Sequence, residues 1–295
     1  MPVHVELRDD RSEKIRYNSP DYPIYIRRGL LSSYPNFTAP CHWHDDIELI
    51  AVLDGKMTYN VNGTLVEIEG GEGIFVNSRQ LHFGFSARRQ ECDFICVLLH
   101  PILLCAMPET ERNYVMPIVQ NAGVPYRKLG DGIPWQREAL KIIREMNRSK
   151  KSGAAPLRIQ AGFFELWALL YENLSVETRS PKPESLDLTI TKNMVGFIQQ
   201  NYTRKISLAE IAASGSVGQS KCCKLFSHYF QKSPMQYLIQ YRLNKSIDLL
   251  RDTDLSITEI ALATGFDGGS YYAETFRKWL GQSPSAYRKQ GPKTV

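Results

Sequence analysis

Long apolar runs are missing from this sequence of 295 residues. A membrane-spanning helix needs roughly 18 or more consecutive apolar residues, and no segment of the chain reaches that length. The first residues, MPVHVELRDDRSEK, also lack the apolar core of a secretion signal. We therefore expect a cytoplasmic protein that has no membrane partner.

Cysteine is scarce as well. The spacing of the six cysteines is not that of a disulfide framework: Cys41, Cys92, Cys96, Cys105, Cys222 and Cys223. On a strand, Cys92 and Cys96 would lie about 13 Å apart, which is too far to share a zinc ion. We expect reduced thiols, with these two buried as small hydrophobic side chains.

A strong excess of charge of one sign is absent too, since the net charge is only +5. Its distribution is uneven, however. From Ser185 to the last residue there are 14 Lys and Arg against 8 Asp and Glu, a difference of +6, whereas the first 184 residues carry 22 against 23. A basic excess confined to the C-terminal third suggests a nucleic-acid partner, although many domains without that function carry a similar charge.

The first hundred residues predict short strands separated by tight turns. The predicted strands are residues 22–28, 47–53, 56–61, 64–69, 74–76 and 93–99. Asn62-Gly63 is a strong hairpin signal, and the glycines at 70–73 mark another turn rather than a phosphate loop, because no helix follows them. Short strands with turns every 8 to 12 residues or so predict a β-sandwich or small barrel.

After Pro134 the pattern becomes helical. Residues 135–150 and 156–174 predict two helices, each with a proline near its start. The second is apolar almost all round, so one face would cover the sheet and the other would be buried inside the chain or against a second copy, with Leu166 and Leu170 as candidate contacts. The polar segment 175–186 predicts a linker between domains at 1–174 and 187–295.

The C-terminal domain contains an internal repeat. The segment ISLAEIA at 206–212 returns as LSITEIA at 255–261, and Gly215 returns at Gly265. In each copy a Ser-x-x-Glu capping box opens a short helix, a glycine ends it, and a second helix follows. Two helices joined in this way form a helix-turn-helix, so the domain should contain two such units in tandem.

The second copy carries a more specific pattern. It contains GF at 265–266, SYY at 270–272, FRK at 276–278, GQSP at 281–284 and YR at 287–288. This pattern resembles the signature of the AraC/XylS family of transcription regulators. The resemblance implies an α+β chain in which a cupin-like β-barrel with a helical hairpin precedes an all-α domain with two helix-turn-helix units. It implies double-stranded DNA, a small-molecule effector, a second copy of the chain and RNA polymerase as partners, and neither a cofactor nor catalysis.

The resemblance also places the residues that face DNA. A recognition helix presents its exposed N-terminal side chains to base edges in the major groove. The candidates in the first unit are Gly218, Gln219, Ser220, Lys221, Cys223 and Lys224, of which Ser220, Cys223 and Lys224 are favoured for base contacts. Those in the second unit are Gly269, Ser270, Ala273 and Glu274. Glu274 could accept from cytosine, could be a neutral surface residue or could pair with Arg277, so we expect the second unit to read bases more weakly.

A second hypothesis comes from the stretch CHWHDDIELIAVLDG at 41–55. His42 and His44 would lie about 6.6 Å apart on one strand face, and Glu48 could join them if the chain bends at Asp45-Asp46. With His82, the spacing resembles a cupin motif, whose ligands hold zinc or iron. The proline-glycine pattern expected before that histidine is replaced by NSRQL at 77–81.

We expect these four residues to hold an effector, such as a sugar or related metabolite, by hydrogen bonds and without a metal. Tyr25, Trp43, Phe83 and Phe85 would either stack on a sugar or simply fill the core. The main alternative is a cupin metalloenzyme that uses the same four residues, which would leave the duplicated helix-turn-helix without a purpose. The other alternative is a helical interaction module that does not touch DNA.

Overall fold

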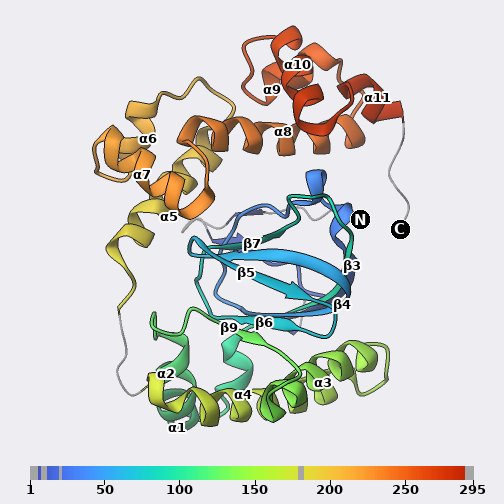
Figure 1. Ribbon diagram of the computed structural model, residues 1–295, viewed down its shortest axis with the longest axis vertical. Helices are drawn as coiled ribbons and strands as arrows, with labels where there is room; N and C mark the ends of the chain where they lie inside the picture. Colours follow the sequence, from blue (N-terminus) through green and yellow to red (C-terminus); the bar gives the residue numbers. More distant parts are fainter. Residues whose placement is uncertain (1–5, 8–11, 20–21, 179–182, 290–295) are drawn as a thin grey trace. The chain divides into compact units, whose positions relative to one another are not determined.

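The computed structural model describes residues 6–7, 12–19, 22–178 and 183–289, and it divides into two compact units (Figure 1). One unit ends at Ser185 and the other begins at Leu186. The first combines an antiparallel sheet with helices, and the second is helical throughout its described residues, as the sequence predicts. None of the described helices is both long enough and apolar enough to span a membrane.

A seven-stranded antiparallel sheet builds the N-terminal unit. Its strands are β3 (Ile24–Leu30), β4 (Ile47–Val61), β5 (Thr64–Glu69), β6 (Gly73–Val76), β7 (His82–Phe85), β8 (Cys92–Leu99) and β9 (Tyr126–Leu129). The first part of β4 pairs with β6 and β8, and its second part pairs with β5 and β7. The long β4 therefore carries the sheet round a corner into the barrel-like form of Figure 1. A separate pair joins β1 (Glu6–Leu7) to β2 (Glu13–Lys14).

The corner of β4 lies at Gly55. The register with β8 shifts between Val52 and Asp54, and Gly55 has a φ of 76°. A Cβ at this position would lie 2.2 Å from the carbonyl oxygen of Glu91, so only glycine fits. The sequence predicted two strands here, and the structure joins them because a β-bulge bends a strand without ending it. The predicted hairpin at Asn62-Gly63 is confirmed, with φ values of 51° and 87°.

Two long helices cover one face of the sheet: α3 (Pro134–Ser149) and α4 (Ala155–Thr178). Apolar side chains of both helices share one core with strands β3, β4 and β8, and a second core fills the inside of the barrel. Both helices were predicted, but α4 extends into the segment expected to be the linker, of which 179–182 lie outside the described residues. Short helical segments complete the unit: η1 (Leu31–Ser33), η2 (Pro35–Phe37), η3 (Pro101–Leu104), α1 (Pro108–Thr110), η4 (Glu111–Val115) and α2 (Met116–Val119).

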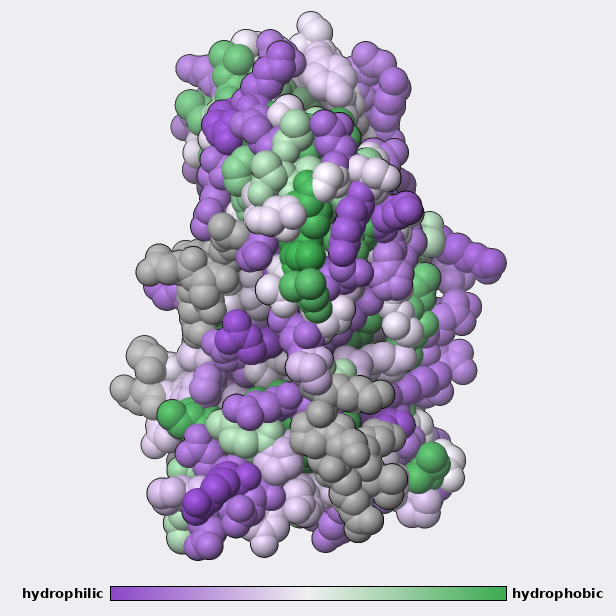
Figure 2. Space-filling view, turned by 90° about the vertical axis from the view of Figure 1, so that its left-hand side faces the viewer, coloured by the Kyte–Doolittle hydropathy of each residue, from purple (hydrophilic) through white to green (hydrophobic). Residues whose placement is uncertain are grey.

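One side of α4 stays exposed. Leu166 and Leu170 are fully buried in the core of their own unit, so the expectation that they contact a second copy has to be corrected. The exposed side instead carries Leu157 and Phe164, which are 72% and 40% exposed. Elsewhere the surface is largely hydrophilic: on the face shown in Figure 2, hydrophobic residues form one elongated group and several smaller ones.

The C-terminal unit consists of seven described helices: α5 (Leu186–Asn201), α6 (Leu208–Ser214), α7 (Gln219–Phe230), α8 (Pro234–Asp252), α9 (Ile257–Ala263), α10 (Gly269–Leu280) and α11 (Pro284–Lys289). The pairs α6–α7 and α9–α10 form the two predicted helix-turn-helix units, and α8 connects them. The capping boxes that open α6 and α9 are both present, with Ser207 and Ser256 accepting from the amides of Glu210 and Glu259.

The turns of the two units differ from what the repeated glycines suggest. The left-handed residue that follows α9 is Gly265, with φ 83°, but its counterpart after α6 is Ser216, with φ 57°. Gly215 is needed for another reason, since a Cβ there would lie 2.8 Å from the Met194 side chain on α5. The one-residue difference in repeat spacing therefore arises after these left-handed residues, where Asp267 is the extra residue.

Arg242 on α8 connects the two helix-turn-helix units. Its Nε donates to the carbonyl oxygen of Tyr202 at 2.8 Å, and its Nη2 donates to that of Arg204 at 2.7 Å. The guanidinium also lies 6.0 Å from the ring centre of Phe266, in the turn of the second unit. A Cβ on Gly265 would lie 2.2 Å from the same Tyr202 oxygen. The segment entering the first unit thus packs directly on the turn of the second.

Candidate functional site

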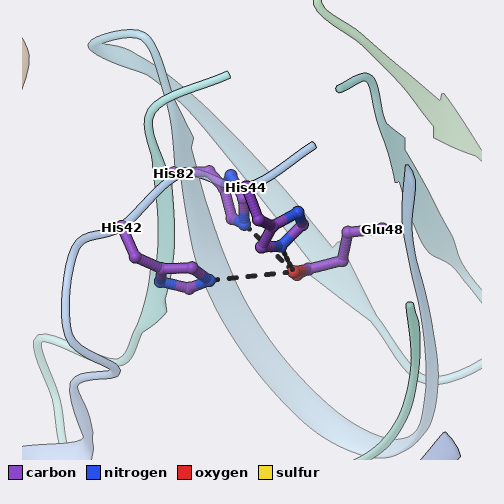
Figure 3. Close-up of side chains that lie close together, drawn as sticks. All are labelled: His42, His44, Glu48 and His82. Atoms are coloured by element: carbon purple, nitrogen blue, oxygen red, sulfur yellow. Dashed lines mark hydrogen bonds and ion pairs between the residues drawn. The ribbon is translucent and has the colours of Figure 1, made fainter. Parts of the chain in front are cut away.

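Three segments of the barrel bring the predicted effector residues together. His42 and His44 precede β4, the chain bends at Asp45 and Asp46, and Glu48 then lies on β4. His82 begins β7 and exchanges two backbone hydrogen bonds with His42. Figure 3 shows the three imidazoles pointing at one carboxylate oxygen of Glu48.

The distances within this group are short. The Nε2 atoms of His82, His44 and His42 lie 3.0, 3.3 and 4.0 Å from Glu48 Oε2. One ligand atom from each of the four residues lies within 4.8 Å of the others. The other oxygen of Glu48 accepts a hydrogen bond from the hydroxyl of Tyr59. The sequence spacing therefore identified four side chains that do converge.

Backbone hydrogen bonds fix which nitrogen of each imidazole faces the centre. All three Nδ1 atoms lie 2.7 to 3.0 Å from backbone carbonyl oxygens two residues away in the chain. A carbonyl only accepts, so each Nδ1 carries a proton and each Nε2 faces Glu48. In a neutral imidazole that Nε2 is a lone pair, which can accept a hydrogen bond or bind a cation. In a protonated imidazole it carries a second proton and donates to Glu48.

The electrostatics of the group favour positive charge beside Glu48. Burial by itself would raise the pKa of Glu48, but His82 and the hydrogen bonds from His44 and His82 lower it well below its usual value. Burial opposes a charged His44, yet its hydrogen bond to Glu48 raises its pKa to about 9. Burial and the two neighbouring imidazoles lower the pKa of His42 to about 3. The surroundings of Glu48 thus favour a proton, or another cation, next to its carboxylate.

A fifth side chain, Glu13, belongs to the group and was not predicted. Its Oε2 lies 3.3 Å from His42 Nε2, and its amide donates to the Trp43 carbonyl oxygen at 2.7 Å. Burial raises the pKa of Glu13 to about 7; the negative charge of Glu48 adds to this rise, and His44 opposes it. The charged N-terminal segment gives no spacing that would indicate a buried carboxylate.

The residues fit a divalent cation. Two ligand atoms that are each about 2.1 Å from one ion lie about 3.0 to 3.4 Å apart at octahedral or tetrahedral angles. The distances from Glu48 Oε2 to His82 and His44 fall in this interval. Ligating histidines also usually donate their second ring N–H to a carbonyl or carboxylate, as all three do here. A metal ion is therefore as compatible with this geometry as an organic effector.

Further polar side chains share the inner face of the sheet with Glu48. Tyr25 and Glu48 are both paired with Leu98, and Arg27 lies two residues further along β3, so all three project from the same face. Burial raises the pKa of Tyr25 to about 12. Of the predicted aromatics, Trp43 and Phe83 are buried and the other two are partly buried. The barrel interior thus contains hydroxyl and guanidinium donors as well as the histidines.

The candidates in the first helix-turn-helix lie at the start of α7. Gln219, Ser220, Lys221 and Lys224 are exposed, Gly218 caps the helix, and Cys223 is partly buried. Leu225 and Phe226 are buried, as expected. Lys221 Nζ lies 2.8 Å from Asp187 Oδ1 on α5, so this lysine forms an ion pair within the C-terminal unit.

The candidates in the second unit occupy the same part of α10. Ser270 and Glu274 are exposed, whereas Gly269 and Ala273 are partly buried. Glu274 pairs with Lys278 at 2.7 Å, so the predicted partner Arg277 has to be corrected. Arg277 lies one turn beyond Ala273 and is exposed. Tyr271, next to Ser270, is exposed as well. Helical periodicity from Ser270 could have identified Arg277 as a further DNA-facing residue.

Comparisons with known proteins decide the family. A model of the AraC-like ligand binding domain matches residues 27–167, and a helix-turn-helix domain model matches residues 211–290. The chain belongs to the AraC family of transcriptional regulators. The N-terminal unit of this AraC-family chain thus contains its ligand-binding domain, and α6 to α11 form its DNA-binding part.

Relatives of this AraC-family chain cover nearly its whole length. It is 26% identical to the HTH-type transcriptional regulator YdeC of Bacillus subtilis, over 94% of this chain and 95% of that protein. It is 24% identical to the melibiose operon regulatory protein of Escherichia coli K12, over 91% and 89%. The crystal structure of ToxT from Vibrio cholerae O395 aligns over 92% of this chain and 99% of ToxT, with 13% identity and a TM-score of 0.48.

The family assignment confirms the predicted class of fold and the DNA-binding and ligand-binding functions. The named relatives are transcriptional regulators, and nothing in the comparisons supports the cupin metalloenzyme alternative.

Proposed function

We propose that a small polar effector, bound inside the barrel at His42, His44, Glu48 and His82, controls how this AraC-family regulator binds its operator. The observation that carries the proposal is the buried group of ionisable side chains in the ligand-binding domain. Burying such groups costs free energy unless they are paired or serve a ligand. Because the same chain carries two helix-turn-helix units, the ligand is best explained as a signal for DNA binding.

The chemistry of the barrel interior supports a hydroxyl-rich effector such as a sugar. The Nε2 atom of a neutral imidazole can accept from a hydroxyl group, while Tyr25 and Arg27 supply donors on the same inner surface. The name of one relative, the melibiose operon regulatory protein, associates that protein with a disaccharide. Melibiose is therefore a reasonable first probe for this chain.

For DNA, we propose that α7 contributes more to the recognition of bases than α10 does. Exposed Ser220 and Lys224 lie on the first turns of α7, where a recognition helix contacts base edges. On α10 the corresponding exposed residues are Ser270 and Glu274, and the carboxylate of Glu274 would face the phosphate backbone. The pairing of Glu274 with Lys278 reduces that repulsion without adding a donor for the bases.

We also propose that the chain acts as a homodimer joined through the exposed side of α4. Leu157, Ala161, Phe164 and Ala168 follow each other at intervals of three and four residues, so they form one stripe along the helix. All four are exposed, in contrast to the buried side that includes Leu166 and Leu170. A second copy of the same helix would cover this stripe.

The proposed effector site is tested with the full-length chain and DNA from its own promoter region. Melibiose and a panel of mono- and disaccharides are screened for an upward shift in melting temperature, because a ligand stabilises the fold to which it binds. A sugar that stabilises the wild type should also change the affinity for DNA, measured by fluorescence anisotropy. Glu48→Gln should abolish both effects, whereas Glu67→Gln, on the exposed part of β5, should leave both unchanged. A sugar that acts equally on the wild type and Glu48→Gln would contradict the assignment of the site.

A further inference from the structure

The five side chains of this group, Glu48 included, pose a problem of charge. Because backbone carbonyls hold their Nδ1 protons, the imidazoles of His42, His44 and His82 present only lone pairs to the carboxylates of Glu48 and Glu13 whenever they are neutral. Acceptors that face one another at 3.0 to 4.0 Å repel unless a positive charge lies among them. A proton on His44, whose pKa is raised to about 9 by its hydrogen bond to Glu48, supplies one such charge. A divalent cation bound to the imidazole lone pairs would replace that proton and balance both carboxylates.

We propose that these five side chains hold one divalent first-row transition-metal ion and that Glu13 supplies its second carboxylate. The inference rests on the proposed function, since it names what the effector site contains. Imidazole nitrogens combined with carboxylate oxygens suit zinc, iron, nickel and manganese better than calcium or magnesium, which prefer oxygen alone. The four motif residues provide one carboxylate, so the spacing of the motif does not include the ligand that completes the charge balance.

The position of Glu13 supports this role. Its amide is held by the carbonyl oxygen of Trp43, the residue between His42 and His44, which fixes the carboxylate beside the imidazoles. His42 Nε2 lies nearer to Glu13 Oε2, at 3.3 Å, than to Glu48 Oε2, at 4.0 Å. His42 Nε2 is therefore close to both carboxylates, although Glu13 lies outside the group of four residues whose ligand atoms all lie within 4.8 Å of one another, so its side chain would have to move closer to bind the same ion.

Asp46 is a third buried carboxylate nearby, but it has its own partner. Its two oxygens lie 3.0 and 3.2 Å from the hydroxyl of Tyr17, which donates to them. The competing explanation concerns Glu13 alone: it would form a structural ion pair with a protonated His42 and bind no metal. The two explanations differ in what Glu13→Gln does to the protein when no metal is present.

The metal is tested first on the full-length chain, purified without an affinity tag or chelator. Elemental analysis should find about one transition-metal ion per chain, and the protein stripped of metal should bind one Co²⁺ with a visible absorption spectrum. Glu13→Gln should weaken Co²⁺ binding by at least the roughly 10- to 100-fold seen when groups one step further from a metal are removed. It should also change the intensity of the Co²⁺ bands, because water replaces a carboxylate. Glu67→Gln serves as the control with an equal change in charge.

The second measurement separates a metal ligand from a structural partner. In the metal-free protein, Glu13→Gln should leave the melting temperature unchanged or raise it, because one of two neighbouring buried carboxylates has gone. A structural ion pair with His42 predicts a lower melting temperature instead, and that result would overturn the assignment of Glu13. Unchanged Co²⁺ affinity and spectrum in Glu13→Gln would overturn it as well.

The hypothesis of a metal site and the hypothesis of a sugar effector can be disproved independently. A wild-type protein that binds neither Co²⁺ nor Zn²⁺ at micromolar concentrations overturns the metal site, while the sugar response of the same preparation still tests the proposed function. One bound ion with no sugar that alters DNA binding supports the metal site and counts against a sugar effector.

Discussion

Lys221 and Lys224 lie one turn apart on α7, and the structure gives them different surroundings. Lys221 is paired with Asp187 at 2.8 Å, whereas the described residues offer Lys224 no ion pair. We therefore expect Lys224→Ala to weaken DNA binding clearly and Lys221→Ala to weaken it much less. Both variants remove the same charge from the same helix, so the general loss of positive charge is controlled.

The size of the effect depends on what Lys224 contacts. Each phosphate contact contributes about 0.9 to the slope of log affinity against log salt. Between 50 and 200 mM salt, one such contact therefore accounts for about a 3.5-fold change in affinity. If Lys224 contacts a base instead, its removal should reduce discrimination at one position by about 1–3 kcal/mol, or roughly 5- to 150-fold.

The assay is fluorescence anisotropy of the full-length chain on an operator fragment and on a scrambled duplex, at four salt concentrations. A phosphate contact lowers affinity for both duplexes and reduces the slope by about one unit. A base contact lowers affinity for the operator alone. Equal losses for Lys221→Ala and Lys224→Ala, or no loss for Lys224→Ala, would refute the reasoning from the Asp187 pair.

Three further predictions concern folding and assembly. Gly265→Ala should lower the stability of the full-length chain by more than about 2 kcal/mol in urea titrations, because φ 83° is combined with a contact of 2.2 Å; Gly281→Ala, at φ 80° with open space, should cost less. Glu210 has its pKa lowered from 4.5 to about 2 by the hydrogen bond from the Ser207 amide and by Arg204, so its stabilising effect is present above pH 4.5 and is lost as the pH falls toward 2. The difference in melting temperature between wild type and Glu210→Gln should therefore shrink over that interval, and a constant difference would contradict this account. Phe164→Asp should sediment as a folded monomer and Leu166→Asp should unfold; a dimeric Phe164→Asp would exclude the α4 interface.

The sequence revealed the histidine site through local spacing, and for that reason it could reveal only part of it. His42, His44 and Glu48 are close in the chain, and the bend at Asp45-Asp46 that unites them follows from the distances a straight strand imposes. Glu13 reaches the site through the pairing of its backbone with Trp43, a contact that leaves no periodic pattern in the sequence. A buried carboxylate in a charged segment looks like a solvated one until the fold is known.

The helical repeat shows a different limit. Capping boxes predicted the starts of α6 and α9 correctly, because the capping interaction lies within four consecutive residues. Aligning Gly215 with Gly265 misplaced the turn, since one glycine makes room for Met194 and the other adopts a left-handed φ. Likewise, the apolar character of α4 predicted that two faces would be buried, but only the packing on α3 and the sheet shows that Leu166 faces inward and Phe164 outward.

The link that Arg242 makes between the two helix-turn-helix units has a consequence for promoters. Each added base pair rotates DNA by about 34–36° and lengthens it by about 3.4 Å. With α8 as a rod of 19 residues, about 28 Å long, and Arg242 fixing both of its neighbours, α7 and α10 cannot follow such a rotation separately. Binding should therefore depend on the helical phase of the two contact sequences, so that a single base pair inserted between them weakens binding as much as the loss of one of them.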